Sequence, residues 1–273
     1  MGNPLSDPTW VLLRGLMREA RHWGDFPALF GAAFPAAAIV TPDLPGNGLL
    51  FRSRSPTSIG AMVESCRAAL ALAGHAPPYR LLALSLGGMV ATEWARRHPA
   101  EIDALVLINT SMRPFSPFHQ RLRPRNYGSL LSALLLPGST VKRETAILDL
   151  VSNHAPRRHA ALPRWVALAE QCPVSRGNGM RQLLAAARFR GPPDGVAPPV
   201  LLLAANGDRL VDPACSAAIA HAWGAPLMSH QDAGHDLPQD DGAWVAASVR
   251  RWLDGPQRLS GGVAAPGGLL DAR

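Results

Sequence analysis

The stretch "LALSLGGMVATEWARRHP" (residues 82–99) decides the fold, because it joins a buried strand to a helix through a single serine. The apolar run that ends just before Ser85 predicts a strand, and residues 86–98 predict a helix that a proline closes. The two glycines after the serine are poor choices for the interior of either element, but they suit a very tight turn. We therefore expect a strand, a sharp turn at Ser85 and a helix.

Apolar runs of strand length alternate with amphipathic helices along most of the chain. This alternation predicts an α/β fold, in which helices cover both faces of a mostly parallel sheet of about six strands. The strands are expected at residues 10–13, 38–42, 79–84, 102–111, 198–208 and 225–230. The principal helices between and after them are expected at residues 58–73, 86–98, 213–223 and 240–253.

Two segments break this alternation. Residues 112–190 contain helix-like pieces and no strand pattern, which predicts a helical cap inserted into a core made of residues 1–111 and 191–254. The pieces are at residues 130–136, 144–151, 165–172 and 179–189. Residues 255–273 are rich in Gly, Pro and Ala, and we expect them to form a disordered tail.

The residues around Ser85 favour a nucleophile. The run from Ala83 to Gly87 fits small-x-Ser-x-Gly, the strand–turn–helix nucleophile elbow, with Ala83 replacing the usual first glycine. Such a turn projects the hydroxyl beyond the carboxyl end of the strand, and the helix N-terminus offers backbone N–H groups to an oxyanion. The alternative is a serine that only caps the helix.

Two downstream residues favour the nucleophile. Asp208 follows a strand in "GDRLVDP", and His235 follows the last strand in "DAGHDLP". The order Ser, Asp, His is the one expected of a hydrolase triad on this fold, with His235 as the base and Asp208 as its orienting acid. Asp212 is better explained as the cap of the next helix, and His22 could line the pocket.

With these motifs, the chain resembles the α/β-hydrolase superfamily up to about residue 254. The matching landmarks are "VLLRGLMREARHW" (11–23), "DLPGNG" (43–48), "LALSLGGMVATEWARRHP" (82–99), "GDRLVDP" (207–213) and "GHDLP" (234–238). Within the superfamily it looks most like the small carboxylesterases of the pimeloyl-ACP methyl ester esterase type. That resemblance implies the triad above and a helical cap inserted after the sixth strand.

The resemblance also implies an oxyanion hole made by the backbone N–H groups of Leu16 and Leu86. This chain departs from the family pattern at Arg14, because the family usually has His-Gly at this loop. We expect the Arg14 side chain to brace the loop or face the pocket, and Arg14 and Trp23 are candidates for the substrate pocket. The family also places two antiparallel strands at the N-terminus. Only nine residues precede the first strand here, so we expect a parallel sheet with the strand at 38–42 on its edge.

Positive charge is concentrated in the expected cap. Residues 112–190 carry 13 of the 27 Lys and Arg residues but only 3 of the 20 Asp and Glu residues. This excess indicates a docking surface for an acidic carrier protein or an anionic substrate, with Arg121, Arg123 and Arg125 as candidates. A solvated surface in an arginine-rich chain is the alternative. Nucleic acid is disfavoured, because no interleaved aromatic pattern or known binding module accompanies the charge.

The sequence therefore predicts a serine hydrolase that cleaves a small-molecule carboxylic ester, or a thioester, through an acyl-enzyme and without a cofactor. A C–C bond hydrolase, a lyase and an acyltransferase could use the same triad, whereas the intact triad disfavours a non-catalytic binding protein. The three cysteines show no CxxC spacing, which disfavours disulfides or a zinc site. No secretory signal or membrane span is evident, so we expect a cytoplasmic protein.

Overall fold

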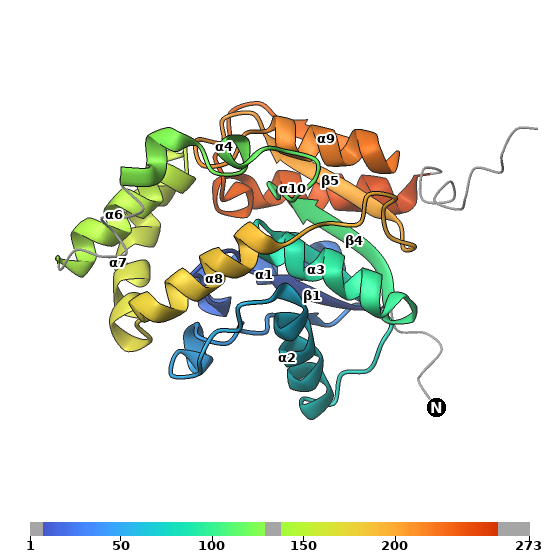
Figure 1. The fold of residues 1–273 in the computed structure, drawn as a ribbon, viewed down its shortest axis with the longest axis horizontal. Coiled ribbons are helices and arrows are strands. Elements are labelled where there is room, and N and C mark those ends of the chain that lie inside the picture. The colour runs from blue at the N-terminus through green and yellow to red at the C-terminus, as the bar shows by residue number, and fades with distance from the viewer. Residues whose placement is uncertain (1–7, 129–137, 256–273) are drawn as a thin grey trace, which may run out of the picture.

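A sheet of six parallel strands forms the centre of the computed structural model, which describes residues 8–128 and 138–255 (Figure 1). The strand order is β2-β1-β3-β4-β5-β6, so β3, which leads into Ser85, lies between β1 and β4. The parallel sheet confirms the predicted fold class, and β2 occupies the expected edge. The strands are β1 (Thr9–Leu13), β2 (Ile39–Val40), β3 (Tyr79–Leu84), β4 (Ile102–Ile108), β5 (Val200–Ala205) and β6 (Leu227–His230).

Both faces of the sheet are buried, and the side chains of each strand alternate between them. In β1, Val11 and Leu13 pack on one face and Trp10 and Leu12 on the other. Because both faces of the central strands are covered, these strands are mostly apolar, and their few charged members are Arg80 of β3 and Asp103 of β4. The first face is covered by α2 (Ile59–Leu72), α3 (Leu86–Arg97) and α9 (Ala214–Trp223), and the second by α1 (Phe26–Ala33) and α10 (Leu237–Asp254).

The chain between β4 and β5 contributes a group of helices. They are α4 (Phe118–Arg121), α6 (Thr140–Val151), α7 (Ala155–Gln171) and α8 (Arg176–Arg188). Helices α6 and α7 pack together to one side of the sheet (Figure 1) and share a small apolar cluster around Leu148 and Trp165. Helix α8 instead packs Ala185 against the core of the first sheet face. The group therefore combines an outlying pair with one helix that is anchored on the core.

Three of these helices begin earlier than the sequence predicts, and α8 does so by starting at Arg176 instead of residue 179. Helix α7 starts at Ala155, before the predicted residue 165, and contains both Pro156 and Pro163. The first proline lies in the opening turn, where a backbone N–H has no helical partner to lose. Helix α6 begins before the predicted residue 144, at Thr140.

Some predictions cannot be compared with the structure. The helix predicted at residues 130–136 and the tail predicted from residue 255 lie, apart from Gly255 itself, outside the described residues. Within the described ranges, no helix has the length and the apolar character needed to cross a bilayer.

Candidate active site

The turn at Ser85 is strained and tightly packed. Ser85 has φ 56° and ψ −114°, a conformation that residues with a side chain rarely adopt. A Cβ on Gly87 would collide with the carbonyl oxygen of Leu13, and one on Gly88 would lie 2.6 Å from Oγ1 of Thr110. Thr110 also donates a hydrogen bond of 2.8 Å to the Ser85 carbonyl oxygen. The two glycines therefore let strand and helix meet closely around a strained serine, as in a nucleophile elbow.

Asp208 and His235 are in direct contact behind this turn. Asp208 lies just beyond β5, is only 2% exposed, and places Oδ2 2.7 Å from Nδ1 of His235. Its other oxygen accepts the backbone N–H groups of Leu210 and Val211, at 2.8 and 3.0 Å. These bonds fix the carboxylate, so it can hold the imidazole in one orientation.

The neighbouring acid, Asp212, has a different role. Its Oδ1 accepts the backbone N–H of Ala214 at 3.0 Å, in the first turn of α9. Its Oδ2 lies 3.4 Å from Nη2 of Arg123. Asp212 thus caps the helix as the sequence predicts, and in the described part of the chain it makes no bond to His235.

Asn109 supports the His235 loop, and the sequence analysis did not find it. It follows β4 with φ 46° and is buried. Its side-chain amide donates to the carbonyl oxygen of His235 at 2.8 Å, and its oxygen accepts the N–H of Ala205 at 2.8 Å. Asn109 thereby ties the end of β5 to the histidine loop.

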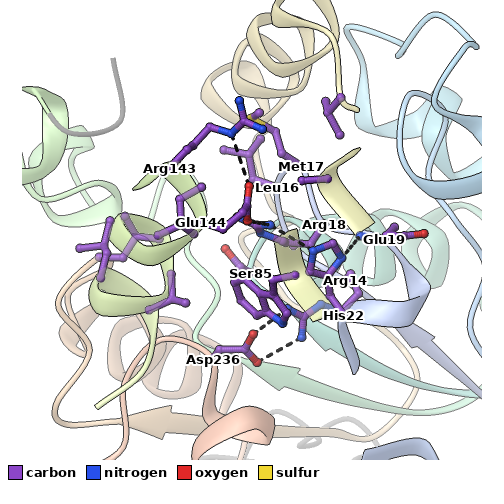
Figure 2. A pocket seen from close by; sticks show the side chains of 18 of the residues that line it. Arg14, Leu16, Met17, Arg18, Glu19, His22, Ser85, Arg143, Glu144 and Asp236 are labelled. Carbon is purple, nitrogen blue, oxygen red and sulfur yellow. Dashed lines mark hydrogen bonds and ion pairs between the residues drawn. The ribbon is translucent and has the colours of Figure 1, made fainter. Parts of the chain in front are cut away.

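Ser85 and His235 both line a cavity of about 770 Å³. Figure 2 shows this cavity with Ser85 labelled. Helices α6, α7 and α8 and the loop after β1 contribute most of its walls. Apolar side chains dominate the lining, among them Leu16, Met17, Ile147, Leu150, Leu168 and Leu210. A cavity of this size and character fits a small molecule with an apolar body.

The loop after β1 approaches the serine closely. A Cβ on Gly15 would lie 3.3 Å from Cβ of Ser85, so a larger residue would push the loop away. Leu16 lines the cavity, and Leu86 is the buried first residue of α3, directly after Ser85. Of the two positions predicted to donate to an oxyanion, Leu86 is therefore next to the serine in the chain, and Leu16 follows the glycine that packs against it.

Gln182 of α8 holds this loop from the other side. Its oxygen accepts the backbone N–H of Met17 at 2.9 Å. Its amide nitrogen donates to Asn47 at 2.8 Å and to Ser55 at 3.1 Å. Because Gln182 is fully buried, these bonds join α8, the loop after β1 and residues 47–55 into one unit.

Arg14 forms a sealed ion pair with Asp236, the residue after His235 (Figure 2). Its two terminal nitrogens lie 3.1 and 2.6 Å from the two carboxylate oxygens. The side chains are only 5% and 2% exposed. The pair therefore bridges the loop after β1 and the loop that carries His235, through two residues that are 222 positions apart in the sequence.

Trp23 does not line the cavity, which corrects its prediction as a pocket residue. Its ring lies 4.7 Å from the Arg14 guanidinium and stacks on Phe26, within the core of the second sheet face. The indole supports the Arg14 side chain from behind instead of meeting a ligand.

A family model described as the alpha/beta hydrolase fold matches residues 22–241. The chain belongs to the α/β-hydrolase family. It is 31% identical over 264 residues to a pimeloyl-[acyl-carrier protein] methyl ester esterase of Aromatoleum aromaticum, covering 90% of this chain and 100% of that protein. A protein of the same name from Xylella fastidiosa is 26% identical over 244 residues, covering 84% and 88%. This α/β hydrolase is therefore of the esterase type.

Solved structures share the fold of this hydrolase. The enol-lactonase from Burkholderia xenovorans LB400 superposes with a TM-score of 0.74 at 18% identity, covering 93% of this chain and 94% of that one. The esterase RhEst1 from Rhodococcus sp. ECU1013 has the same TM-score and identity, covering 92% of each chain. At such low identity the likeness concerns the fold alone.

His22 of the hydrolase lines the cavity, as the sequence analysis allowed. Burial holds the pKa of His22 well below its ordinary value, and the nearby charges of Arg18 and Arg14 lower it further. The imidazole is therefore neutral at neutral pH. It adds no positive charge to the cavity wall.

The three arginines proposed as a docking cluster do not form one surface. Arg121 is buried and donates to the carbonyl oxygen of Ala186 at 2.7 Å, and burial lowers its pKa. Arg123 is half-buried beside Asp212, and only Arg125 is exposed. Arg121 is therefore removed from the candidate surface, because its guanidinium serves to attach α4 to α8.

Proposed function

We propose that this α/β hydrolase cleaves a carboxylic ester, or a thioester, through an acyl-enzyme on Ser85. His235 is the base, and Asp208 orients it. One observation carries the proposal: His235 shares a cavity with the strained Ser85 while its Nδ1 lies 2.7 Å from the buried Asp208 carboxylate. The names of the relatives, which are methyl ester esterases, support an ester as substrate.

Acylation begins when Nε2 of His235 accepts the hydroxyl proton of Ser85 and the oxygen attacks the ester carbonyl. The negative charge that develops on the carbonyl oxygen is stabilised by the backbone N–H groups of Leu16 and Leu86. Asp208 stabilises the imidazolium. The tetrahedral intermediate then collapses, and His235 returns the proton to the departing alcohol or thiol.

Deacylation repeats these steps with water. His235 accepts a proton from a water molecule that attacks the acyl carbon, and the same two N–H groups stabilise the second intermediate. Its collapse releases the carboxylic acid and returns the proton to Ser85. The net reaction consumes one water molecule and produces one acid and one alcohol.

In this proposal residues 112–190 act as a cap, and its positive charge attracts an acidic carrier protein or an anionic substrate. The exposed members of the cap that support this role include Arg125, Lys142 and Arg176. An acyl carrier protein is favoured as the partner because the relatives are named for esters of a carrier-bound acyl group.

The triad is tested with Ser85→Ala, assayed on a p-nitrophenyl ester series and with a fluorophosphonate probe. We expect kcat to fall by several orders of magnitude and the labelling to disappear, while the circular dichroism spectrum stays unchanged. Near-normal turnover by Ser85→Ala would disprove the nucleophile. Labelling of Ser85 without ester hydrolysis would disprove the ester as substrate.

The carrier is tested by the dependence of kcat/KM on salt. The Debye length falls from about 10 Å at 0.1 M to about 3 Å at 1 M, so the value for a carrier-bound ester should fall steeply and that for a neutral small ester should not. Arg125→Glu combined with Lys142→Glu should slow the carrier-bound substrate selectively, and Arg251→Glu on α10 is the matched control. Equal salt dependence for both substrates would remove the docking role.

A further inference from the structure

Positive charge remains in the cavity wall after the ion pairs are counted. Arg14 is paired with Asp236 through both terminal nitrogens, and Glu19 is paired with Arg21. The other charged groups that line the cavity are three arginines and one carboxylate: Arg18, Arg143, Arg176 and Glu144. The cavity is therefore short of negative charge, which favours a ligand that brings an anion.

Arg18 is the arginine best placed to receive that anion. It belongs to the loop after β1, two residues beyond Leu16, and its guanidinium lies 4.6 Å from the centre of the Trp165 ring. Its Nη1 donates to Oε2 of Glu144 at 2.8 Å and lies 3.1 Å from Nε2 of His22 (Figure 2). The ring and the acid fix the plane of the guanidinium.

The other edge of Arg18 is free. Its Nε and Nη2 have no hydrogen-bond partner among the described residues, and the side chain keeps 12% of its surface exposed, against 4% for Glu144. In a guanidinium, Nε–H and Nη2–H point the same way and match the two oxygens of one carboxylate. Glu144 thus holds Arg18 through Nη1 and leaves the Nε–H and Nη2–H groups available to a ligand.

Glu144 does not cancel the charge of this site. The same carboxylate also lies 3.4 Å from Nε of Arg143, so it is shared by two guanidinium groups. Arg176, at the start of α8, forms no ion pair within the described part of the chain. A carboxylate supplied by the ligand would bring the numbers of cations and anions in the cavity wall closer to balance.

We propose that Arg18 forms an anion-binding subsite that selects esters ending in a free carboxylate remote from the scissile bond, such as half-esters of dicarboxylic acids. The proposal rests on the proposed function, which places the scissile carbonyl at Ser85. Apolar side chains from α6 and α7, including Ile147, Leu150 and Leu168, line the same cavity and suit the methylene chain between the two ends. The subsite takes up the anionic-substrate alternative of the proposed function, in which the far end of the substrate is a free carboxylate and is not attached to a carrier.

The test compares monomethyl adipate with methyl hexanoate. Both are methyl esters of a six-carbon chain, and they differ in whether the far end is a carboxylate or a methyl group. The readout is the ratio of their kcat/KM values, measured as methanol release. We expect the wild-type protein to favour the half-ester, and Arg18→Gln to lower the ratio about tenfold or more, because a charge-assisted bidentate contact is lost.

Glu144→Gln provides the opposite change. It removes the carboxylate that competes for Arg18 and repels the substrate, so the ratio should rise. The matched control is Arg188→Gln, which removes an exposed arginine of α8 that does not line the cavity and should leave the ratio unchanged. If Arg18→Gln and Glu144→Gln shift the ratio in the same direction, or if neither shifts it, the pair only connects the loop to α6 and the subsite is disproved.

A binding measurement separates this proposal from the proposed function. The adipate dianion is titrated into Ser85→Ala by calorimetry, with and without Arg18→Gln. Tighter binding when Arg18 is present supports the subsite even if Ser85 proves not to be the nucleophile. Equal affinity in the two proteins would disprove the subsite even if Ser85 is the nucleophile.

Discussion

Arg14 and Arg18 lie four residues apart on the same loop, and each pairs with one acid, yet their surroundings differ. Arg14 places both terminal nitrogens on Asp236, and both side chains are almost sealed from solvent. Arg18 gives one nitrogen to Glu144 and keeps its other edge open to the cavity. Access to the unpaired N–H groups therefore separates an arginine that joins two loops from one that can bind a ligand, because Nε of Arg14 is also unpaired but is buried.

The largest expected effect comes from breaking the sealed pair. Arg14→Leu leaves the Asp236 carboxylate buried without a partner, so the free energy of unfolding should fall by about 3–5 kcal/mol. Urea denaturation measures the loss. The double variant Arg14→Leu, Asp236→Leu should recover most of it, because no buried charge then remains. A loss below about 1 kcal/mol in the single variant would contradict the sealed pair.

A milder change at the same position addresses catalysis. Arg14→Lys keeps the positive charge but cannot hold both oxygens of Asp236, so the oxyanion loop should lose its fixed position. We expect kcat to fall about tenfold with little change in KM, since the oxyanion contact forms mainly in the transition state. Steady-state kinetics on a neutral ester measure both values. An unchanged kcat would show that the pair serves stability alone.

His22 lies close to both arginines and gives a pH-dependent readout. Its pKa in the folded protein is lowered by burial and by the two guanidinium charges, whereas the unfolded chain binds a proton near pH 6.5. Unfolding then takes up a proton below about pH 6.5, so this stability should be fully present above about pH 6.5 and should fall as the pH is lowered, by up to about 1.4 kcal/mol per unit. The difference between wild type and His22→Leu across this range isolates the effect. Parallel profiles would contradict the lowered pKa.

The smallest expected effect comes from the open pair. Glu144→Gln should reduce the free energy of unfolding by only about 1 kcal/mol, because Arg18 can then meet water in the cavity. Urea denaturation of Glu144→Gln and Arg14→Leu under the same conditions compares the two losses in the free energy of unfolding. A cost as large as that of the sealed pair would show that Arg18 is not accessible from the cavity.

The sequence reveals features whose pattern is local. The alternation of buried strands and helices predicts the parallel sheet. The two glycines that follow Leu86 predict the tight turn at Ser85. The positions of Asp208 and His235 just after two strands are also legible, because parallel strands end on the same side of a sheet. The contact between these two residues is predicted only by the order Ser, Asp, His along the sequence.

Long-range polar contacts are where sequence reasoning fails. Asp236 follows the histidine and looks like an ordinary loop acid, and nothing nearby indicates that it pairs with Arg14 across 222 residues. Gln182 and Asn109 sit alone in apolar or helical surroundings and carry no motif. Arg121 belongs to a basic segment whose charge predicts an exposed surface, yet the packing of α4 against α8 buries its side chain. Burial of a charged side chain depends on tertiary neighbours that local spacing does not encode.

The backbone of Ser85 implies a trade-off between stability and activity. A residue with a side chain at φ 56°, ψ −114° costs roughly 1–3 kcal/mol, whereas glycine would relieve that strain at an entropic cost of about 0.5–1 kcal/mol. A glycine at this position would therefore make a more stable protein that lacks the Ser85 hydroxyl. The native chain keeps the strained serine at a position that lines the cavity, which is the pattern expected when selection acts on chemistry more strongly than on folding.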